Sequence, residues 1–187
     1  MQDCQPGFFG TKSSATEKGR IVNELDRALD IALKGPEAQS ALAEFQRQIA
    51  SWNVAMPPVT PLVLDFGLGD FRRTGLIEYW IANEAVAGYC GKYLFVFDGQ
   101  TCPRHRHRTK HETFFIVKGT LAVEYEDRQL DLREGEVLAI EPWKYHSFTG
   151  KGPTLLLELS RPCEIDDNYF YNPDIPIGGN FRGRARS

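Results

Sequence analysis

Long hydrophobic runs and paired cysteines are both missing from this chain. No apolar stretch approaches the roughly 18 residues of a membrane-spanning helix, and no charged region precedes an apolar core at the start, so neither a membrane span nor a signal peptide is predicted. The four cysteines lie far apart and form no C-x-x-C pair, which argues against a zinc ribbon and a dithiol redox site. A cytoplasmic protein with reduced thiols is therefore the default prediction.

An excess of charge of one sign is also absent. The 22 basic and 25 acidic residues leave a net charge of -3, so no general attraction to nucleic acid or to an anionic membrane is expected. With 187 residues, of which 42% are hydrophobic and 12% aromatic, the chain has enough apolar side chains for one folded domain. The expected partner is a small molecule held in a pocket.

Histidine is scarce and unevenly distributed, since three of the four histidines lie within residues 101–119. In that stretch the motif H-x-H-x(4)-E-x(6)-G is formed by His105, His107, Glu112 and Gly119. Side chains two positions apart on an extended segment point to the same face, so the two histidines of the motif can bind one ion. The glutamate can add a carboxylate ligand. A merely solvated basic loop is the alternative, but the concentration of histidine favours a metal site.

The fourth histidine, His146, ends a second segment with the spacing G-x(6)-P-x(3)-H, which begins at Gly135. A hairpin of strands 136–141 and 145–148 could return His146 to the face that carries the first two histidines. Three imidazoles and one carboxylate suit Mn, Fe, Co, Ni or Zn and do not select among them. His111 directly precedes the carboxylate ligand and so points to the opposite face, which predicts that it is not a ligand.

Two amphipathic helices are predicted ahead of the strands, after a loose arm at residues 1–12. A capping box at residues 14–17, followed by apolar residues at helical spacing, predicts a first helix that ends at Lys34-Gly35-Pro36. Pro36 can begin a second helix, whose apolar stripe is Ala38, Leu42, Phe45 and Ile49. The two helices, within residues 13–57, are predicted to form a hairpin that packs on the strands as scaffold.

From residue 58 onward the pattern changes to short apolar runs separated by turn residues. The predicted strands are 62–66, 76–83, 92–98, 112–118, 120–125, 128–132, 136–141, 145–148 and 154–160. No helix-length segment interrupts them, which favours a mainly β protein with an antiparallel barrel or double-sheet jelly roll at residues 58–175. The chain after Pro162 is expected to be irregular, and residues 176–187 a solvated tail.

The two histidine motifs resemble those of the cupins, which are small antiparallel β-barrels. The first motif matches at every defined position. In the second, the proline comes one residue late and Lys144 stands where the family usually has glycine. The resemblance implies a cupin barrel in which His105, His107, Glu112 and His146 bind a metal. The departure affects the tight turn before His146 but leaves the ligand assignment unchanged.

A longer resemblance covers residues 62–173. The segments LVLDFGLGDF, YCGKYLFVFDGQTCPRHRH, ETFFIVKG, GEVLAIEPWKYHSF, LLLELS and DDNYFYNP are similar to those of the cupin-type D-lyxose isomerases. This resemblance implies interconversion of D-lyxose and D-xylulose, with D-mannose and D-fructose as a further pair, assisted by Mn(II). It also implies a homodimer that acts on a small-molecule sugar.

Such a reaction requires removal of a C2 proton, a cis-enediolate, and return of a proton at C1. Glu158, in the leucine-rich strand 154–160, is the candidate base, because burial is expected to raise its pKa. The alternative is a carboxylate at the strand end that faces solvent or pairs with an arginine such as Arg161. Lys92 is a candidate for binding a sugar hydroxyl or stabilising the enediolate, and a solvated strand-edge lysine is the alternative. Asp167 is a weaker candidate for substrate binding, and the preferred interpretation is that its side chain caps a turn.

Two other functions are open from the sequence. A mononuclear Fe(II) cupin with free coordination positions can be a dioxygenase, and other cupins bind sugars without catalysis. Lys92 and Glu158, as polar residues beyond the four ligands, distinguish an isomerase from a binding module. Only the longer resemblance separates an isomerase from a dioxygenase.

Overall fold

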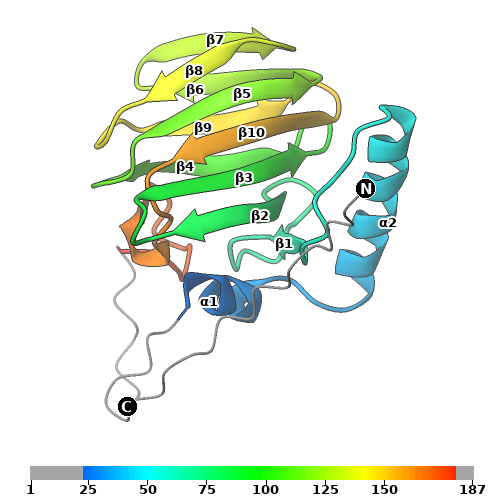
Figure 1. Ribbon diagram of the computed structural model, residues 1–187, viewed down its shortest axis with the longest axis horizontal. Helices are drawn as coiled ribbons and strands as arrows, with labels where there is room; N and C mark the ends of the chain where they lie inside the picture. Colours follow the sequence, from blue (N-terminus) through cyan, green and yellow to red (C-terminus); the bar gives the residue numbers. More distant parts are fainter. Residues whose placement is uncertain (1–22, 180–187) are drawn as a thin grey trace, which may run out of the picture.

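The computed structural model describes residues 23–179, in which two helices precede two facing antiparallel sheets (Figure 1). The helical elements are α1 (Glu24–Ile31), α2 (Pro36–Ser51) and the short 3-10 helix η1 (Ile165–Asp167). The strands are β1 (Leu62–Leu64), β2 (Leu76–Glu84), β3 (Tyr89–Val96), β4 (Thr101–His107), β5 (Glu112–Lys118), β6 (Thr120–Tyr125), β7 (Arg128–Arg133), β8 (Val137–Ile140), β9 (His146–Gly150), β10 (Thr154–Ser160) and β11 (Asn168–Phe170).

The six-stranded sheet has the order β1-β2-β3-β10-β5-β8, and the five-stranded sheet has the order β11-β4-β9-β6-β7. Neighbouring strands are antiparallel throughout the part of the chain that is described. The consecutive strands β5 and β6 lie in different sheets, and so do β8 and β9, which is the connectivity of a double-sheet jelly roll. The mainly β, double-sheet fold predicted from the sequence is confirmed.

The crossing from β5 to β6 depends on Gly119. Its φ of +85° lies in the left-handed region, and a Cβ at this position would lie 2.4 Å from the carbonyl oxygen of Pro153. Both constraints select glycine. The glycine of the first motif therefore has a backbone role, separate from that of the ligands.

Alternation along the strands divides the side chains between an interior and an exterior. The buried interior between the sheets includes Leu94, Phe114, Ile116, Val123, Phe148 and Leu156. Burial of side chains of this size stabilises a fold by about 1.5–3 kcal/mol each. The same alternation directs a set of polar side chains inward near one end of the barrel, where the candidate site lies.

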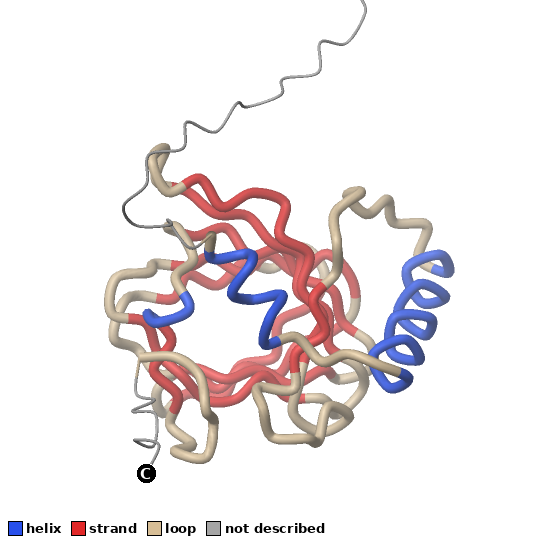
Figure 2. Tube along the Cα trace, turned by 90° about the horizontal axis from the view of Figure 1, so that it is seen from below, coloured by secondary structure: helices blue, strands red, loops and turns tan. Residues whose placement is uncertain are grey.

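The two helices pack on different parts of this framework. α2 covers the outer face of the six-stranded sheet, where the ring of Phe45 lies 5.2 Å from that of Tyr79 and 4.9 Å from that of Phe95. α1 lies across the open end of the barrel, and its Ala28, 3% exposed, joins the interior core (Figure 2). The two helices therefore do not pack against each other, because their apolar stripes face different cores. The predicted helical hairpin required such packing.

The observed start of α1 also differs from the prediction. Its N-cap is Asn23, whose side chain accepts a hydrogen bond from the backbone N–H of Leu25 at 3.1 Å. The capping box predicted at residues 14–17 lies outside the described residues, as do the predicted loose arm and most of the C-terminal tail. Within the described range, no helix is long and apolar enough to cross a membrane.

Three features of the strands correct the sequence-based predictions. The polar segment of the first motif is itself a strand, β4, which the apolar pattern did not reveal. The segment after Pro162 is ordered into η1 and β11, and β11 pairs with β4. The predicted hairpin before His146 is wrong, because β8 pairs with β5 in one sheet while β9 pairs with β4 and β6 in the other.

Candidate metal centre and active site

Strands β4 and β9 bring three imidazoles together inside the barrel. His105 and His107 share the inward face of β4, and His146 is the register partner of His105 on β9. The ring centroid of His105 lies 4.9 Å from that of His107 and 4.2 Å from that of His146. One potential ligand atom from each residue lies within 4.8 Å of the other two, and all three residues are buried. These three histidines can hold a metal ion.

Hydrogen bonds to the backbone orient each imidazole. The Nδ1 atom of His105 lies 2.7 Å from the carbonyl oxygen of Pro103. That of His107 lies 3.1 Å from the carbonyl oxygen of Asp167, and that of His146 lies 3.2 Å from the carbonyl oxygen of Lys144. Such bonds place a proton on Nδ1 and leave Nε2 as the free lone pair. Among the described residues, the buried Nε2 atoms of His107 and His146 form no hydrogen bond of acceptable geometry, although both face carboxylate oxygens of Glu112. Buried polar nitrogens without such a bond are the expected signature of a metal-binding site.

Glu112, at the first position of β5, brings a carboxylate from the opposite sheet. Its two oxygens lie 2.8 Å from Nε2 of His107 and 3.3 Å from Nε2 of His146. Burial acts to raise the pKa of Glu112, but the ammonium of Lys110 and the imidazoles of His107 and His146 together outweigh it and hold the pKa well below the usual range. Burial lowers the pKa of His105 and His107. An ionised carboxylate beside neutral imidazoles is the donor set that a divalent metal requires.

A network of buried charges adjoins these ligands. Glu158 on β10 and Lys92 on β3 are register partners, both 3% exposed, and Nζ of Lys92 lies 3.3 Å from Oε2 of Glu158. Nζ of Lys110 lies 3.2 Å from Oε1 of Glu158 and also contacts Glu112. Ser160 donates a hydrogen bond to the same Oε1 at 3.0 Å. The candidate base is therefore linked to the metal ligands through one ammonium group.

The expected direction of the Glu158 pKa was wrong. Burial acts to raise the pKa of Glu158, but attraction to Lys110 and then to Lys92 outweighs it, so the pKa lies below the ordinary value. Glu158 is consequently a carboxylate at neutral pH. Its partners are these two lysines, so the alternative pairing with Arg161 does not describe the site.

Sequence reasoning missed Lys110, which is 4% exposed, because this residue belongs neither to the ligand pattern nor to an apolar run. The available signal was its position two residues before Glu112, which places both side chains on one face. Glu78 was also missed. One oxygen of its carboxylate accepts a hydrogen bond from Nε1 of Trp80 at 2.6 Å, and the other lies 3.6 Å from Nζ of Lys92.

Asp167 holds the loop that carries Lys110. Its carboxylate accepts hydrogen bonds from the backbone N–H groups of Arg108, Thr109 and Lys110 and from the Thr109 hydroxyl. Both oxygens are engaged by these contacts, which supports the turn interpretation for Asp167 over contact with a sugar. Its own backbone carbonyl also orients His107, so Asp167 positions two parts of the site.

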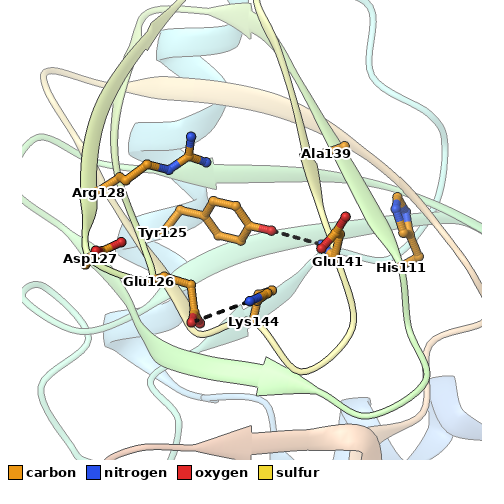
Figure 3. Close-up of a pocket in the computed structure, with 8 residues that line it drawn as sticks. All are labelled: His111, Tyr125, Glu126, Asp127, Arg128, Ala139, Glu141 and Lys144. Carbon is orange, nitrogen blue, oxygen red and sulfur yellow. Dashed lines mark hydrogen bonds and ion pairs between the residues drawn. The ribbon is translucent and has the colours of Figure 1, made fainter.

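A wider hollow, about 550 Å³ in volume, lies on the outside of the barrel (Figure 3). There the hydroxyl of Tyr125 accepts a hydrogen bond from the backbone N–H of Glu141, and Lys144 lies 3.9 Å from Glu126. His111 lines this hollow and is exposed, as expected for a residue that is not a ligand. His105 and Glu112 line a small interior cavity instead, so the size of a cavity alone does not indicate where the chemistry is.

A two-sheet jelly roll that gathers histidines from β4 and β9 and a carboxylate from β5 defines a cupin. In agreement, a cupin domain profile matches residues 95–160, and a D-lyxose isomerase profile matches residues 60–126. The D-lyxose/D-mannose isomerase of Thermosediminibacter oceani is 31% identical over 141 residues, which cover 60% of this chain and 77% of that protein. The D-lyxose ketol-isomerase of a Thermofilum species is 30% identical over 142 residues, with the same coverage. The chain belongs to the D-lyxose isomerase family.

Solved structures show the same fold. The L-ribose isomerase of Cellulomonas parahominis superposes with a TM-score of 0.63 at 16% identity, and the match covers 78% of this chain and 95% of that one. The L-ribose isomerase of Geodermatophilus obscurus gives a TM-score of 0.62 at 15% identity, covering 75% and 93%. Because the sequence identities are this low, the two structural matches show a shared fold and nothing more.

Proposed function

We propose that this protein is a metal-dependent aldose-ketose isomerase that interconverts D-lyxose and D-xylulose, and also D-mannose and D-fructose. The observation that carries the proposal is the buried network of Lys92, Glu158 and Lys110 against the ligand Glu112. It supplies an ionised base and two cations beside the metal donors. The named activities of the two relatives support the same reaction class.

Glu158 is the proposed base of the proton transfer. One of its oxygens faces Lys92, and the other faces Lys110 and Ser160, so the carboxylate is fixed in position on both sides. C1 and C2 of an aldose are adjacent, so one carboxylate can remove the C2 proton and return it to C1, while the hydroxyl proton on O2 passes to O1. Its lowered pKa keeps it unprotonated before the reaction.

Lys92 and Lys110 are proposed to bind sugar oxygens and to stabilise negative charge on the enediolate. Preorganised cations in a site without bulk water act more strongly than in solution. A divalent metal held by His105, His107, Glu112 and His146, with Mn(II) as the proposed ion, supplies Lewis acidity for charge that develops on O1 and O2. The protein groups and the metal donors are thus proposed to act on the same two carbons of the sugar.

A sugar-binding module without catalysis accounts less well for this arrangement. Buried charges are costly to desolvate, and Glu158, Lys92 and Lys110 are each no more than 4% exposed. Neutral hydroxyl or amide groups could recognise a sugar without that cost. An ionised base beside the metal donors is needed for proton transfer.

The test is to remove metal with a chelator, add Mn(II) or Fe(II), and incubate the protein with D-lyxose or D-mannose. Formation of the ketose without oxygen uptake is expected. Oxygen consumption in the Fe(II) sample would instead support the dioxygenase alternative. Binding of the sugar with no conversion under either metal would support the binding module.

The assembled state is proposed to be a homodimer. The outer face of the six-stranded sheet beyond α2 exposes Phe115 at 38%, Val137 at 58% and Leu159 at 52%. Phe115 and Val137 are register partners, so the apolar surface is continuous between β5 and β8. Exposed apolar patches of this kind are typical of association sites. Light scattering after size exclusion tests the mass, and Phe115→Glu should yield a monomer if this face forms the contact.

A further inference from the structure

A second cavity lies beneath α1, next to the interior cavity that holds the site, and the two cavities share part of their lining. The first, about 40 Å³, includes His105, Lys110, Glu112 and Glu158 in its lining. The second is about 60 Å³. The residues that line both are Phe66, Glu78, Lys92, Asn168 and Phe170. A molecule with one end at Glu158 that is long enough to pass Lys92 and Glu78 would therefore reach the cavity beneath α1.

The second cavity differs chemically from the first. Its walls away from the shared residues are mainly apolar and consist of Ala28, Ile31, Leu64, Trp80, Cys163, Ile165 and Ile177. Polar groups lie where the two cavities meet, and they include the Glu78 carboxylate and the Lys92 ammonium. An aldose with its carbonyl end at Glu158 would place its middle hydroxyls at this junction and its last carbon among the apolar walls.

α1 forms part of that apolar wall, and its position is defined by specific contacts. Glu24 accepts a hydrogen bond from the backbone N–H of Ile165 at 2.7 Å, and Arg27 pairs with Asp166 at 2.8 Å. Ala28 and Ile31 are three positions apart, so they share one helix face and both line the cavity. Because the cavity is small, a change of one to three carbons in either side chain alters a large part of its volume.

We propose that Ala28 and Ile31 determine the length of the aldose that the enzyme accepts. This inference rests on the proposed isomerase function and assigns α1 a role in specificity. Alanine at position 28 leaves space for the last carbon of the substrate, and isoleucine at position 31 limits that space at the solvent side. A pentose ends against these side chains, whereas a hexose has one further carbon to place there.

The test compares kcat/KM for D-mannose and D-lyxose in the Mn(II)-loaded full-length protein. Ile31→Ala enlarges the cavity and should raise the D-mannose to D-lyxose ratio by about tenfold, the size of effect that one methylene has in an apolar pocket. Ala28→Val reduces the cavity and should lower the ratio by a similar factor. Asp30→Ala is the matched control, because Asp30 is exposed on the same helix and lines neither cavity.

The outcomes separate the two proposals. An unchanged ratio in both variants, with both sugars still converted, overturns the role of α1 and leaves the isomerase function in place. Conversion of neither sugar by the unmodified enzyme overturns the proposed function itself. If Ala28→Val lowers the melting temperature, Ile31→Ala still decides the matter, since Ile31 is 36% exposed and tolerates truncation. A changed ratio is not expected from a purely structural effect, which would reduce both activities together.

Discussion

Lys92 and Glu158 form a buried ion pair across β3 and β10, with 3.3 Å between Nζ and Oε2. Both groups are almost completely buried, so each depends on the other and on the neighbouring Glu78 and Lys110 for compensation of its charge. Removing one partner of such a pair leaves an uncompensated buried charge. The first two predictions follow from this dependence.

Glu158→Gln should reduce kcat for D-lyxose by at least about 100-fold, because a neutral amide cannot accept the C2 proton. Metal content, measured by inductively coupled plasma mass spectrometry, should not change, since Glu158 is not among the proposed ligands. Glu134→Gln, at an exposed carboxylate that pairs with Lys118, is the matched control. Near-normal turnover in Glu158→Gln would exclude this residue as the base.

Lys92→Met should destabilise the protein by about 3–5 kcal/mol, the usual cost of breaking a buried ion pair from one side. The double variant Lys92→Met, Glu158→Gln should be more stable than Lys92→Met, because the carboxylate that has lost one of its two cations is then replaced by a neutral amide. Urea unfolding of both single variants and the double variant measures this coupling. Additive losses would show that the pair is not coupled.

Metal removal should abolish isomerisation and lower the melting temperature. A ligand that binds only the folded state stabilises it by about 2.7 kcal/mol at one hundred times its Kd. Addition of Mn(II) should restore both properties in the unmodified protein but not in His146→Ala. His111→Ala should behave like the unmodified protein, because His111 is exposed on the outer hollow. Loss of metal binding in His111→Ala would contradict the ligand assignment.

Asp167→Asn should lower stability by about 1–3 kcal/mol, because an amide cannot accept all the hydrogen bonds that the carboxylate receives from residues 108–110. Turnover should fall through kcat, since that loop positions Lys110. A rise in KM alone, with stability unchanged, would point instead to direct contact with the sugar. Asp174→Asn provides a control at a nearby exposed carboxylate.

Cys90, Cys102 and Cys163 should resist iodoacetamide at pH 8 in the folded protein. All three are free and buried, and burial raises the pKa of each thiol, that of Cys163 to about 12. A raised pKa favours the neutral thiol at this pH, whereas alkylation requires the thiolate. Peptide mass spectrometry before and after denaturation measures the difference. Rapid labelling of Cys163 in the native protein would mean that the site is more open than described.

Features that depend on neighbouring residues were predictable from the sequence. The range of α2 follows from Pro36 and an apolar stripe at helical spacing, and β5, β6 and β10 have the predicted bounds. The spacing of His105, His107 and Glu112 placed three polar side chains on inward faces, because alternation in a strand is a local property. Local periodicity was sufficient to predict a mainly β fold with a candidate metal site, whereas the cupin family was predicted from the resemblance of the two histidine motifs.

Features that depend on register between distant strands were decided only by the tertiary structure. His146 reaches the other histidines through a crossing between sheets, and the pairing of β3 with β10 places Lys92 against Glu158. That contact, together with Lys110, reverses the expected direction of the Glu158 pKa, because two nearby cations outweigh burial. The position of α1 over the barrel likewise depends on contacts with η1, far along the chain. Sequence periodicity determines which side chains point inward, whereas the folded structure determines which of them meet.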